Sequence, residues 1–245
     1  MNVDTVPRTL AVATLVALAC SAMVATAVHL LRPVQQGYQQ LDRNRSIVEA
    51  AGLLPPGVVS DTEIIGDFLD IEAHVVDLHS GDYLPQPDAH TFNHWAPPGD
   101  GSAATEAADN TRVPVYIVRR DGALERIVLP VDGPGMWDTI YGYIALAADL
   151  NTVLDLVIYK HAETPAIGDR IEQPEWRAKW QGKRIYDEKG NVQIGVSGRP
   201  DALYGVDLIS GASITSDAVG TLVQHWFGDD GYKTYLKRLR QEAQK

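Results

Sequence analysis

Thiols are almost missing from this chain of 245 residues, which has a single cysteine, Cys20. Cys20 lies inside the most apolar segment, so the rest of the chain cannot form a disulfide, a cysteine-ligated zinc site or an iron–sulfur centre. Basic residues are also scarce, since 21 Lys and Arg stand against 32 Asp and Glu, for a formal net charge of −11. Phosphate backbones are bound by basic surfaces, so we expect no nucleic acid as a partner.

Common catalytic and nucleotide-binding signatures are missing as well. The chain has no Walker loop and no GxGxxG, and "GASIT" at residues 211–215 lacks the second glycine of a nucleophile elbow. His90 and His94 are four residues apart in "HTFNHWAPP", which is too loop-like to place both on one helical face. His161, followed by Glu163, fits a polar strand end better than a catalytic pair. We therefore expect neither a metal site nor a catalytic acid or base.

Charge is absent from residues 9–31, a run of 23 residues bounded by Arg8 and Arg32. A helix of about 20 apolar residues spans a bilayer core, whereas the apolar region of a cleaved signal peptide is roughly 7–15 residues long. "ALAC", ending at Cys20, would also suit a lipoprotein signal, but the run stays apolar beyond it. The sequence predicts a retained anchor over residues 1–33, in contact with lipid through residues 9–31. Its flanking arginines, counted naively, favour the orientation opposite to that of an exported domain.

The segments after the anchor mix helical and strand-like patterns without a regular βαβ rhythm, which predicts an α+β domain over residues 34–245. Apolar periodicity predicts helices over 35–51, 216–226 and 232–245, and a short one from Glu175. Strand-like runs cover 113–119, 124–129 and 152–159, while 62–78 is strand-like or mixed. Asp121-Gly122 indicates a hairpin between the first two strands. The segment 85–112, rich in Pro, Gly and small polar residues, predicts a long flexible surface loop.

Hydroxyl groups crowd the stretch "DLISGASITSDAV", residues 207–219. The simplest interpretation is a helix entrance, in which Ser213 or Ser216 caps the helix and Asp217 adds negative charge to the first turn. The same geometry is also an anion site. Free amides after Ser213 would point at a phosphate, and the small residues Gly211 and Ala212 would let it approach. Capping and phosphate binding are compatible.

A family resemblance adds to this interpretation. "DLISGASITS" resembles the flavinylation motif D-x-x-S/T-G-A-T/S, in which a flavin transferase joins FMN through its phosphate to the last hydroxyl. Three further stretches are similar to one family: "GPGMWDTIYGYIALAADLNTV" from residue 133, "HAETPAIGDRIEQPEWRAKWQGK" from residue 161, and "HWFGDDGY" near the C-terminus. Over most of its length the chain resembles the C subunits of sodium-translocating NADH:quinone oxidoreductases. These bacterial membrane complexes share an FMN-binding domain with the G subunits of Rnf-type electron-transport complexes.

The resemblance implies a set of cofactor-binding residues. Ser213 would hold FMN by a phosphoester, with Thr215 as the reserve acceptor. The remaining residues belong to the motif or to the expected walls of the flavin pocket: Asp207, Ser210, Gly211 and Ala212 in the motif, Glu163, Thr164, Ile167 and Gly168 in the loop 163–168, and Trp137, Gly135 and Tyr143 as further contacts. For these last three, packing in the core is the alternative.

Two departures from the family pattern concern this site. Ser213 stands where the family usually has Thr, and "TPAIG" at residues 164–168 stands where it has "TPGLG". Serine offers the same hydroxyl chemistry, so the ester can form. Ala166 adds a Cβ where the loop would approach the flavin.

The resemblance also implies partners and a location. The chain would relay electrons in the bacterial inner membrane, with its soluble domain on the periplasmic side. Its partners would be the other membrane subunits and the flavin transferase. NADH would react on another subunit, because this chain has no nucleotide-binding signature, and the complex as a whole would reduce quinone. The alternatives are a G-type subunit of an Rnf-like complex, and a membrane-anchored binding or scaffold module. An anchored hydrolase using Ser213 would lack a His–Asp partner set.

Overall fold

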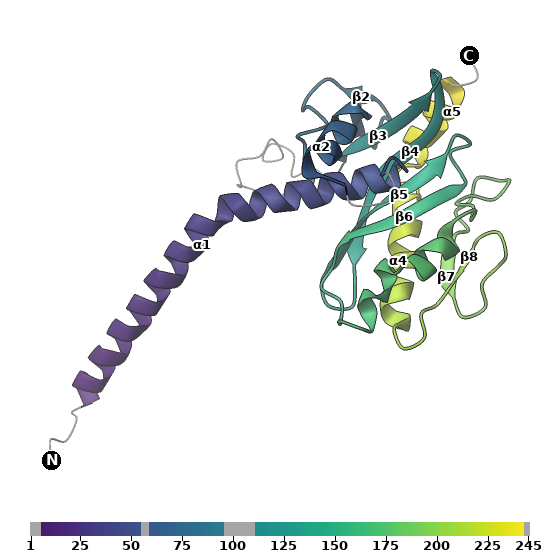
Figure 1. Ribbon diagram of the computed structural model, residues 1–245. Coiled ribbons are helices and arrows are strands. Elements are labelled where there is room, and N and C mark those ends of the chain that lie inside the picture. The colour runs from purple at the N-terminus through teal and green to yellow at the C-terminus, as the bar shows by residue number, and fades with distance from the viewer. Residues whose placement is uncertain (1–5, 55–58, 96–110, 243–245) are drawn as a thin grey trace. The chain divides into compact units, whose positions relative to one another are not determined.

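The computed structural model describes residues 6–54, 59–95 and 111–242 (Figure 1). The chain divides into two compact units, Met1–Asp42 and Arg43–Lys245. Helix α1, Val6–Ala50, begins in the first unit and ends in the second.

The first unit consists of the amino-terminal part of α1. The sequence predicted two helices, over 9–31 and 35–51, and the structure joins them into one that contains Pro33. A proline inside a helix removes one intrahelical hydrogen bond but does not always end the helix. No residue of the most apolar stretch of α1 is buried, and the helix is long and apolar enough to cross a membrane.

The second unit is built on a six-stranded sheet with the order β2-β1-β3-β4-β5-β6, in which all neighbours are antiparallel. The β3–β4 hairpin turns through Asp121 and Gly122, whose φ angles are 53° and 79°. This confirms the hairpin predicted from the Asp-Gly pair, since a two-residue turn of this kind needs positive φ at both positions. The strands are β1 Glu72–Asp77, β2 Tyr83–Leu84, β3 Arg112–Arg120, β4 Ala123–Pro134, β5 Thr139–Ala147 and β6 Val153–Lys160.

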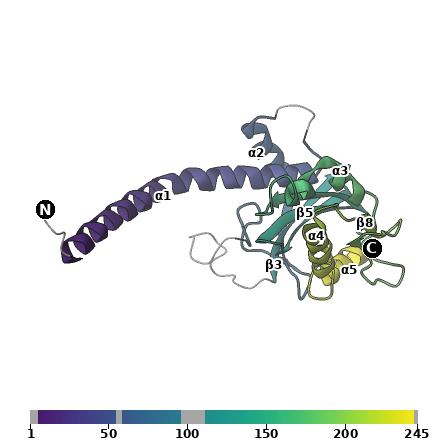
Figure 2. The ribbon, with the colours of Figure 1, turned by 90° about the horizontal axis from the view of Figure 1, so that it is seen from below.

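Other elements cover both faces of this sheet. Successive side chains of a strand point to opposite faces, so each strand can contribute buried residues to both sides. Ile140 and Ile144 of β5 pack into the cluster that includes residues of α4, Ser213–Trp226, and α5, Lys233–Glu242. Tyr143 and Ala145 pack instead with the last turns of α1 and with Phe68 of α2, Asp61–Asp70. Figure 2 shows α2 and α4 on opposite sides of the sheet. The α+β fold class is confirmed.

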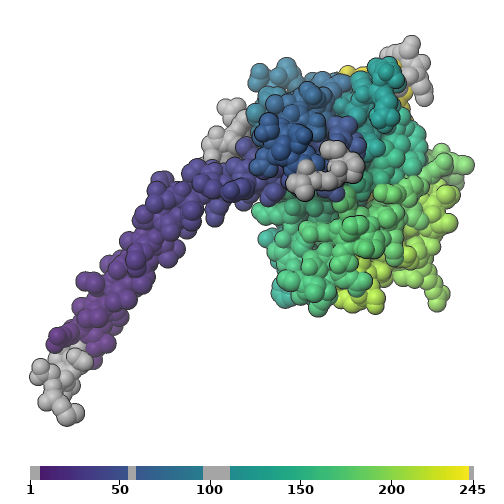
Figure 3. Space-filling model, viewed as in Figure 1, coloured from purple at the N-terminus to yellow at the C-terminus, as the bar shows by residue number. Residues whose placement is uncertain are grey.

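The segments between β6 and α4 carry little regular structure. They comprise η2 Gly168–Glu172, α3 Pro174–Arg177, η3 Ala178–Trp180, and the parallel pair β7 Gly195–Ser197 and β8 Gly205–Asp207. Trp176 and Trp180 anchor them, because both are buried and their rings meet edge to face at 5.6 Å. These segments form much of the green surface of the second unit in Figure 3.

Two predictions from the sequence concern the amino-terminal half of this unit. Residues 62–78 are mixed, with α2 followed by β1, and Ser60 and Glu63 form a reciprocal capping box at the start of α2. The predicted flexible loop 85–112 falls partly on residues 96–110, which lie outside the described residues. Of its described part, Ala89 and Phe92 are buried against the sheet edge.

Candidate functional site

Ser213 is the first residue of α4, and it is exposed. The turn before it is closed by a hydrogen bond of 3.0 Å from Ala212 N–H to Ile209 O. Gly211 takes a φ of +84° in this turn, a conformation that favours glycine. A Cβ added at Gly211 would meet no atom within 4 Å, so the space beside the turn is open.

The start of α4 has no side-chain cap. The N-cap residue is Ala212, whose methyl group cannot accept a hydrogen bond. The prediction that Ser213 or Ser216 caps the helix, with Asp217 in its first turn, is therefore wrong, because the Gly211 turn lets the helix begin at Ser213. The first helical hydrogen bond runs from Ser216 N–H to Ala212 O at 3.0 Å. The preceding amides, those of Ser213, Ile214 and Thr215, have no acceptor within the helix and converge at its positive end.

The hydroxyl groups of this stretch differ in their accessibility. Ser216 is fully buried, and its Oγ donates to Ala212 O at 2.9 Å. Thr215 is also buried, and its Oγ1 donates to Glu163 Oε2 at 2.5 Å. Ser210 and Ser213 are exposed. Of the two hydroxyls predicted as FMN acceptors, Ser213 is therefore accessible and Thr215 is not.

Glu163 joins three segments beneath this helix entrance. Its carboxylate is buried, and Oε1 accepts hydrogen bonds from Met136 N–H at 2.8 Å and Trp137 N–H at 3.2 Å. Oε2 accepts the bond from Thr215. The β4–β5 turn, the loop after β6 and the first turn of α4 are thus held by one side chain. Both carboxyl oxygens are satisfied by hydrogen bonds, as burial of a polar group requires.

Two glycines make this close packing possible. A Cβ on Gly168 would lie 2.8 Å from Glu163 Cβ, and one on Gly135 would lie 2.5 Å from Glu163 Oε1. Neither neighbour is the free end of an exposed side chain, so a larger residue would push Glu163 away. Both glycines were predicted site residues, and the structure places both against Glu163.

The loop from Thr164 to Asp169 winds tightly on itself. Thr164 O accepts the N–H groups of Ile167, Gly168 and Asp169 at 3.2, 2.8 and 3.3 Å. Ala166 has a φ of +62°, in the left-handed region that disfavours a Cβ. Its amide donates to Asp169 Oδ2 at 2.9 Å. A glycine would adopt this conformation without strain.

Exposed apolar side chains gather on the segments that Glu163 joins. Trp137 is 67% exposed and Ile214 61%, while Met136 and Ile167 are both 49% exposed. The Trp137 indole N–H donates to Thr164 Oγ1 at 3.1 Å, so the ring is held at the surface. Exposed apolar side chains that lie together are typical of a binding surface. Tyr143 does not contribute, because it packs in the core on the α1–α2 side of the sheet.

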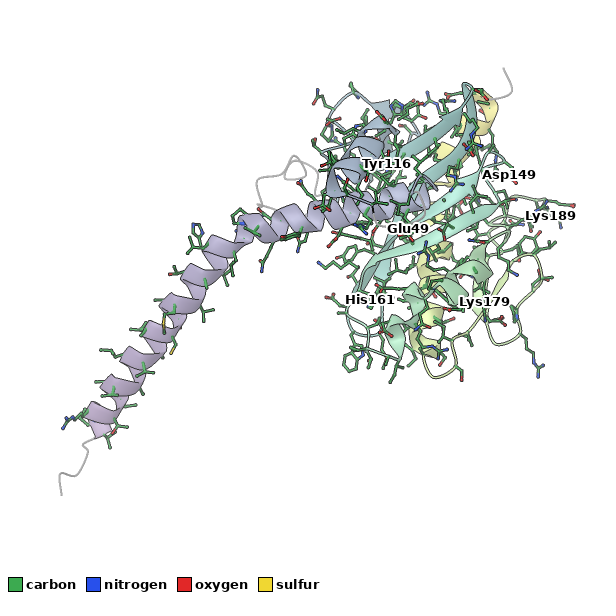
Figure 4. The ribbon with its side chains drawn as sticks, in the orientation of Figure 1. Glu49, Tyr116, Asp149, His161, Lys179 and Lys189 are labelled. Carbon is green, nitrogen blue, oxygen red and sulfur yellow. The ribbon has the colours of Figure 1, made fainter. Side chains whose placement is uncertain are left out.

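His161 supports the start of the loop (Figure 4). Its Nδ1 accepts the Glu163 backbone N–H at 3.0 Å, so the ring proton lies on Nε2, which is 2.9 Å from Glu172 Oε1. His161 therefore contacts the Glu163 backbone and pairs with the carboxylate of Glu172. This arrangement agrees with a polar strand-end residue.

The motif residues before the helix are held by the segments after β6. Asp207 O accepts the Trp176 indole N–H at 2.9 Å, and Asp207 Oδ2 lies 3.2 Å from Lys179 Nζ. Ser210 O accepts from Arg170 Nη1 at 3.0 Å. Four residues at this site were not predicted from the sequence: Met136, Asp169, Arg170 and Ile214. No motif marks them, because their importance comes from contacts and exposure in the folded chain.

The geometry fits FMN in three respects. The uncapped amides suit a phosphate, the open space at Gly211 lets it approach, and the exposed apolar side chains suit an aromatic ring. Ser213 offers an accessible hydroxyl at the same turn. Among the described residues, no group of three or more His, Cys, Asp and Glu side chains is arranged to hold a metal ion.

Comparison with known proteins agrees with this fit. Residues 135–228 match the family model of the FMN-binding domain. The C subunit of the Na⁺-translocating NADH-quinone reductase of Pseudomonas aeruginosa is 38% identical over 98% of this chain and 98% of its own. Its counterpart in Yersinia pestis is 36% identical over 100% of this chain and 97% of its own.

Solved structures show the same fold. The crystal structure of Shewanella oneidensis NqrC superposes with a TM-score of 0.71 at 27% identity, over 84% of this chain and 99% of that one. The C subunit of the Na⁺-translocating NADH-quinone reductase from Parabacteroides distasonis gives a TM-score of 0.67 at 25% identity, over 84% of this chain and 96% of that one. The chain belongs to the family of C subunits of Na⁺-translocating NADH-quinone reductases, which are subunits of an oxidoreductase complex.

Proposed function

We propose that the chain is a membrane-anchored electron relay that carries FMN covalently on Ser213. The observation that carries this proposal is the exposed Ser213 hydroxyl at the start of an uncapped helix, in a chain of the FMN-binding family. The other candidate, Thr215, is buried and donates to Glu163. A transferase must reach the hydroxyl that it modifies, so the accessibility of Ser213 favours it over Thr215.

The residues around Ser213 would hold the two ends of the cofactor differently. The amides of Ser213, Ile214 and Thr215 would donate to the phosphate, and Gly211 leaves it room. Trp137, Met136, Ile167 and Ile214 would contact the ring system through apolar surface. When bound, FMN supplies reversible electron transfer, and the protein supplies its position and surroundings. Glu163 would hold the β4–β5 turn, the loop after β6 and the first turn of α4 in fixed positions around the ring.

Electron relay requires no catalytic acid or base from this chain. The exposed site would let a neighbouring subunit approach the cofactor directly. The named relatives are subunits of Na⁺-translocating NADH-quinone reductases. This supports a place in such a complex over an Rnf-like one or a scaffold role. NADH would react and quinone would be reduced elsewhere in the complex.

Anchoring and maturation complete the proposal. Residues 9–31, on the unburied apolar part of α1, would cross the bacterial inner membrane. The domain from residue 34 onward would lie on the periplasmic side, where the flavin transferase would modify Ser213. The partners would be the other membrane subunits of the complex.

The test is the intact mass of the full chain purified from its own host. We expect an added mass of one FMN less water, with flavin fluorescence that stays with the denatured band in a gel. Ser213→Ala should abolish both signals because no ester oxygen remains, and Ser213→Thr should keep them. Peptide mapping locates the flavin. A wild-type chain without bound flavin, or a flavin retained in Ser213→Ala, would contradict the proposal.

A further inference from the structure

Arg170 lies on η2, directly after the loop that would line the flavin. Its Nη1 donates to Ser210 O at 3.0 Å. Ser210 and Ser213 flank the Gly211 turn, which folds back through the bond from Ala212 N–H to Ile209 O. The guanidinium is therefore fixed to the turn that presents Ser213.

This guanidinium has more N–H donors than its bond to Ser210 O uses. An arginine side chain has five N–H donors, and the carbonyl of Ser210 takes one. Among the residues that the structure describes, no carboxylate lies within ion-pair distance of Arg170. The neighbouring cation Lys179 differs, because it pairs with the carboxylate of Asp207 at 3.2 Å. Arg170 is only partly exposed, so it does not have the full hydration of a surface cation.

Other arginines of the described chain, such as Arg126 and Arg240, are likewise held by a backbone carbonyl, but Arg170 is held by one next to the Gly211 turn. It stands beside a turn whose following helix presents free amides and positive dipole potential. These two positive features would repel each other slightly unless an anion lies between them. A phosphate ester on Ser213 would be such an anion, and guanidinium is well matched to phosphate oxygens.

We propose that Arg170 is a phosphate-binding residue, which donates to the phosphodiester of FMN on Ser213 while it holds Ser210 O. This inference rests on the proposed attachment of FMN to Ser213. Arg170 would neutralise the diester's single negative charge and fix its rotation about the Ser213 side chain. It would also contribute before attachment, when the flavin phosphate must be aligned with the Ser213 hydroxyl.

The test compares full-length chains that carry Arg170→Gln, Arg170→Met or Arg170→Lys. Gln keeps a donor for Ser210 O but removes the charge, Met removes both, and Lys keeps the charge. Arg120→Met is the matched control, since Arg120 lies on the β3–β4 hairpin and pairs with Glu125 at the surface. Thermal unfolding of each chain identifies any variant that does not fold. If Arg170→Met fails to fold, Arg170→Gln decides the result.

The first readout is the ³¹P resonance of the loaded chain. We expect Arg170→Gln and Arg170→Met to move it towards its position in the denatured chain, Arg170→Lys to move it less, and Arg120→Met to leave it unchanged. The second is the initial rate of covalent flavin incorporation by the transferase into the unloaded chain. We expect a loss of about tenfold in Arg170→Gln, the size of one charge-assisted hydrogen bond.

The outcomes separate the two proposals. A wild-type chain that carries flavin, with Arg170→Gln unchanged in both resonance and rate, overturns the role of Arg170 and leaves Ser213 intact. A wild-type chain without a phosphodiester resonance overturns the proposed attachment itself, whatever the variants do.

Discussion

Thr215 Oγ1 donates a 2.5 Å hydrogen bond to Glu163 Oε2 across 52 positions of sequence, and both residues are buried. The bond connects the first turn of α4 to the loop after β6. It also occupies the Thr215 hydroxyl, which would otherwise compete with Ser213 as a flavin acceptor. One contact thus shapes the site, and with FMN attached as proposed it would also favour Ser213 over Thr215 as the attachment point.

Replacing Thr215 by valine removes this donor and leaves Glu163 Oε2 without its partner. We expect a loss of about 1–3 kcal/mol in the free energy of unfolding, the penalty for a buried group left unsatisfied. Flavin should remain on Ser213. Denaturant titration and peptide mapping measure the two effects. Thr221→Val, on the exposed side of α4, is the control and should change neither. Loss of the flavin from a folded Thr215→Val chain would point to Thr215 as the attachment point.

The backbone of Ala166 gives a second prediction. Its φ of +62° is strained for alanine, so Ala166→Gly should stabilise the chain by about 1 kcal/mol. Asp169 Oδ2 holds the Ala166 amide, and Asp169→Ala should therefore destabilise the loop. The double variant should lose less than the sum of the two single effects, since glycine adopts the conformation without the support of Asp169. A double-mutant cycle of unfolding free energies measures this coupling, and additive effects would show that Asp169 does not support Ala166.

Ile167 tests the flavin-lining surface. Its side chain is 49% exposed, so Ile167→Asp should leave the fold and the covalent bond intact. A carboxylate beside an apolar ring alters the ring's electrostatic surroundings, so the visible spectrum or the reduction potential should change. Ile65→Asp on α2, at 45% exposure, is the matched control and should alter neither. An unchanged spectrum and potential in Ile167→Asp would move the loop out of the flavin site.

Truncation tests the anchor. Removing residues 1–33 takes away the apolar run but leaves the last turns of α1, and we expect a soluble, folded domain. Removing residues 1–51 also deletes the fully or nearly fully buried Ile47, Val48, Ala50 and Ala51. That deletion uncovers one face of the sheet, so the product should aggregate or unfold. Gel filtration and circular dichroism distinguish the two. An insoluble product from the shorter truncation would contradict an independent domain.

The sequence predicted those features that depend on neighbouring residues. Asp121-Gly122 indicated the hairpin because its turn is local, and the D-x-x-S-G-A-S pattern pointed to the turn at Ser213. Alternation and periodicity located most helices and strands. The fold class followed from their order along the chain.

The remaining features depend on contacts between distant segments. The bond between Glu163 and Thr215 and the one between Arg170 and Ser210 join residues 52 and 40 positions apart. No local pattern encodes them. The helix entrance was misjudged by three residues, because hydroxyl side chains favour cap positions and the chain instead places Ala212 there. Continuity of α1 through Pro33 was also missed, since proline usually ends a helix.

Alanine at the N-cap of α4 would link the proposed attachment of FMN to the stability of the helix. A helix without a side-chain cap is less stable, by roughly 0.5–2 kcal/mol, than the same helix with Ser or Asp at the N-cap position. In the chain without FMN, the first amides of α4 therefore have no side-chain acceptor. A phosphate ester on the next residue, Ser213, would accept their hydrogen bonds. A serine or aspartate at 212 would satisfy the same amides from within and compete with the cofactor. With FMN on Ser213 as proposed, the absence of a side-chain oxygen at one position would leave the helix end free for a group that arrives after folding.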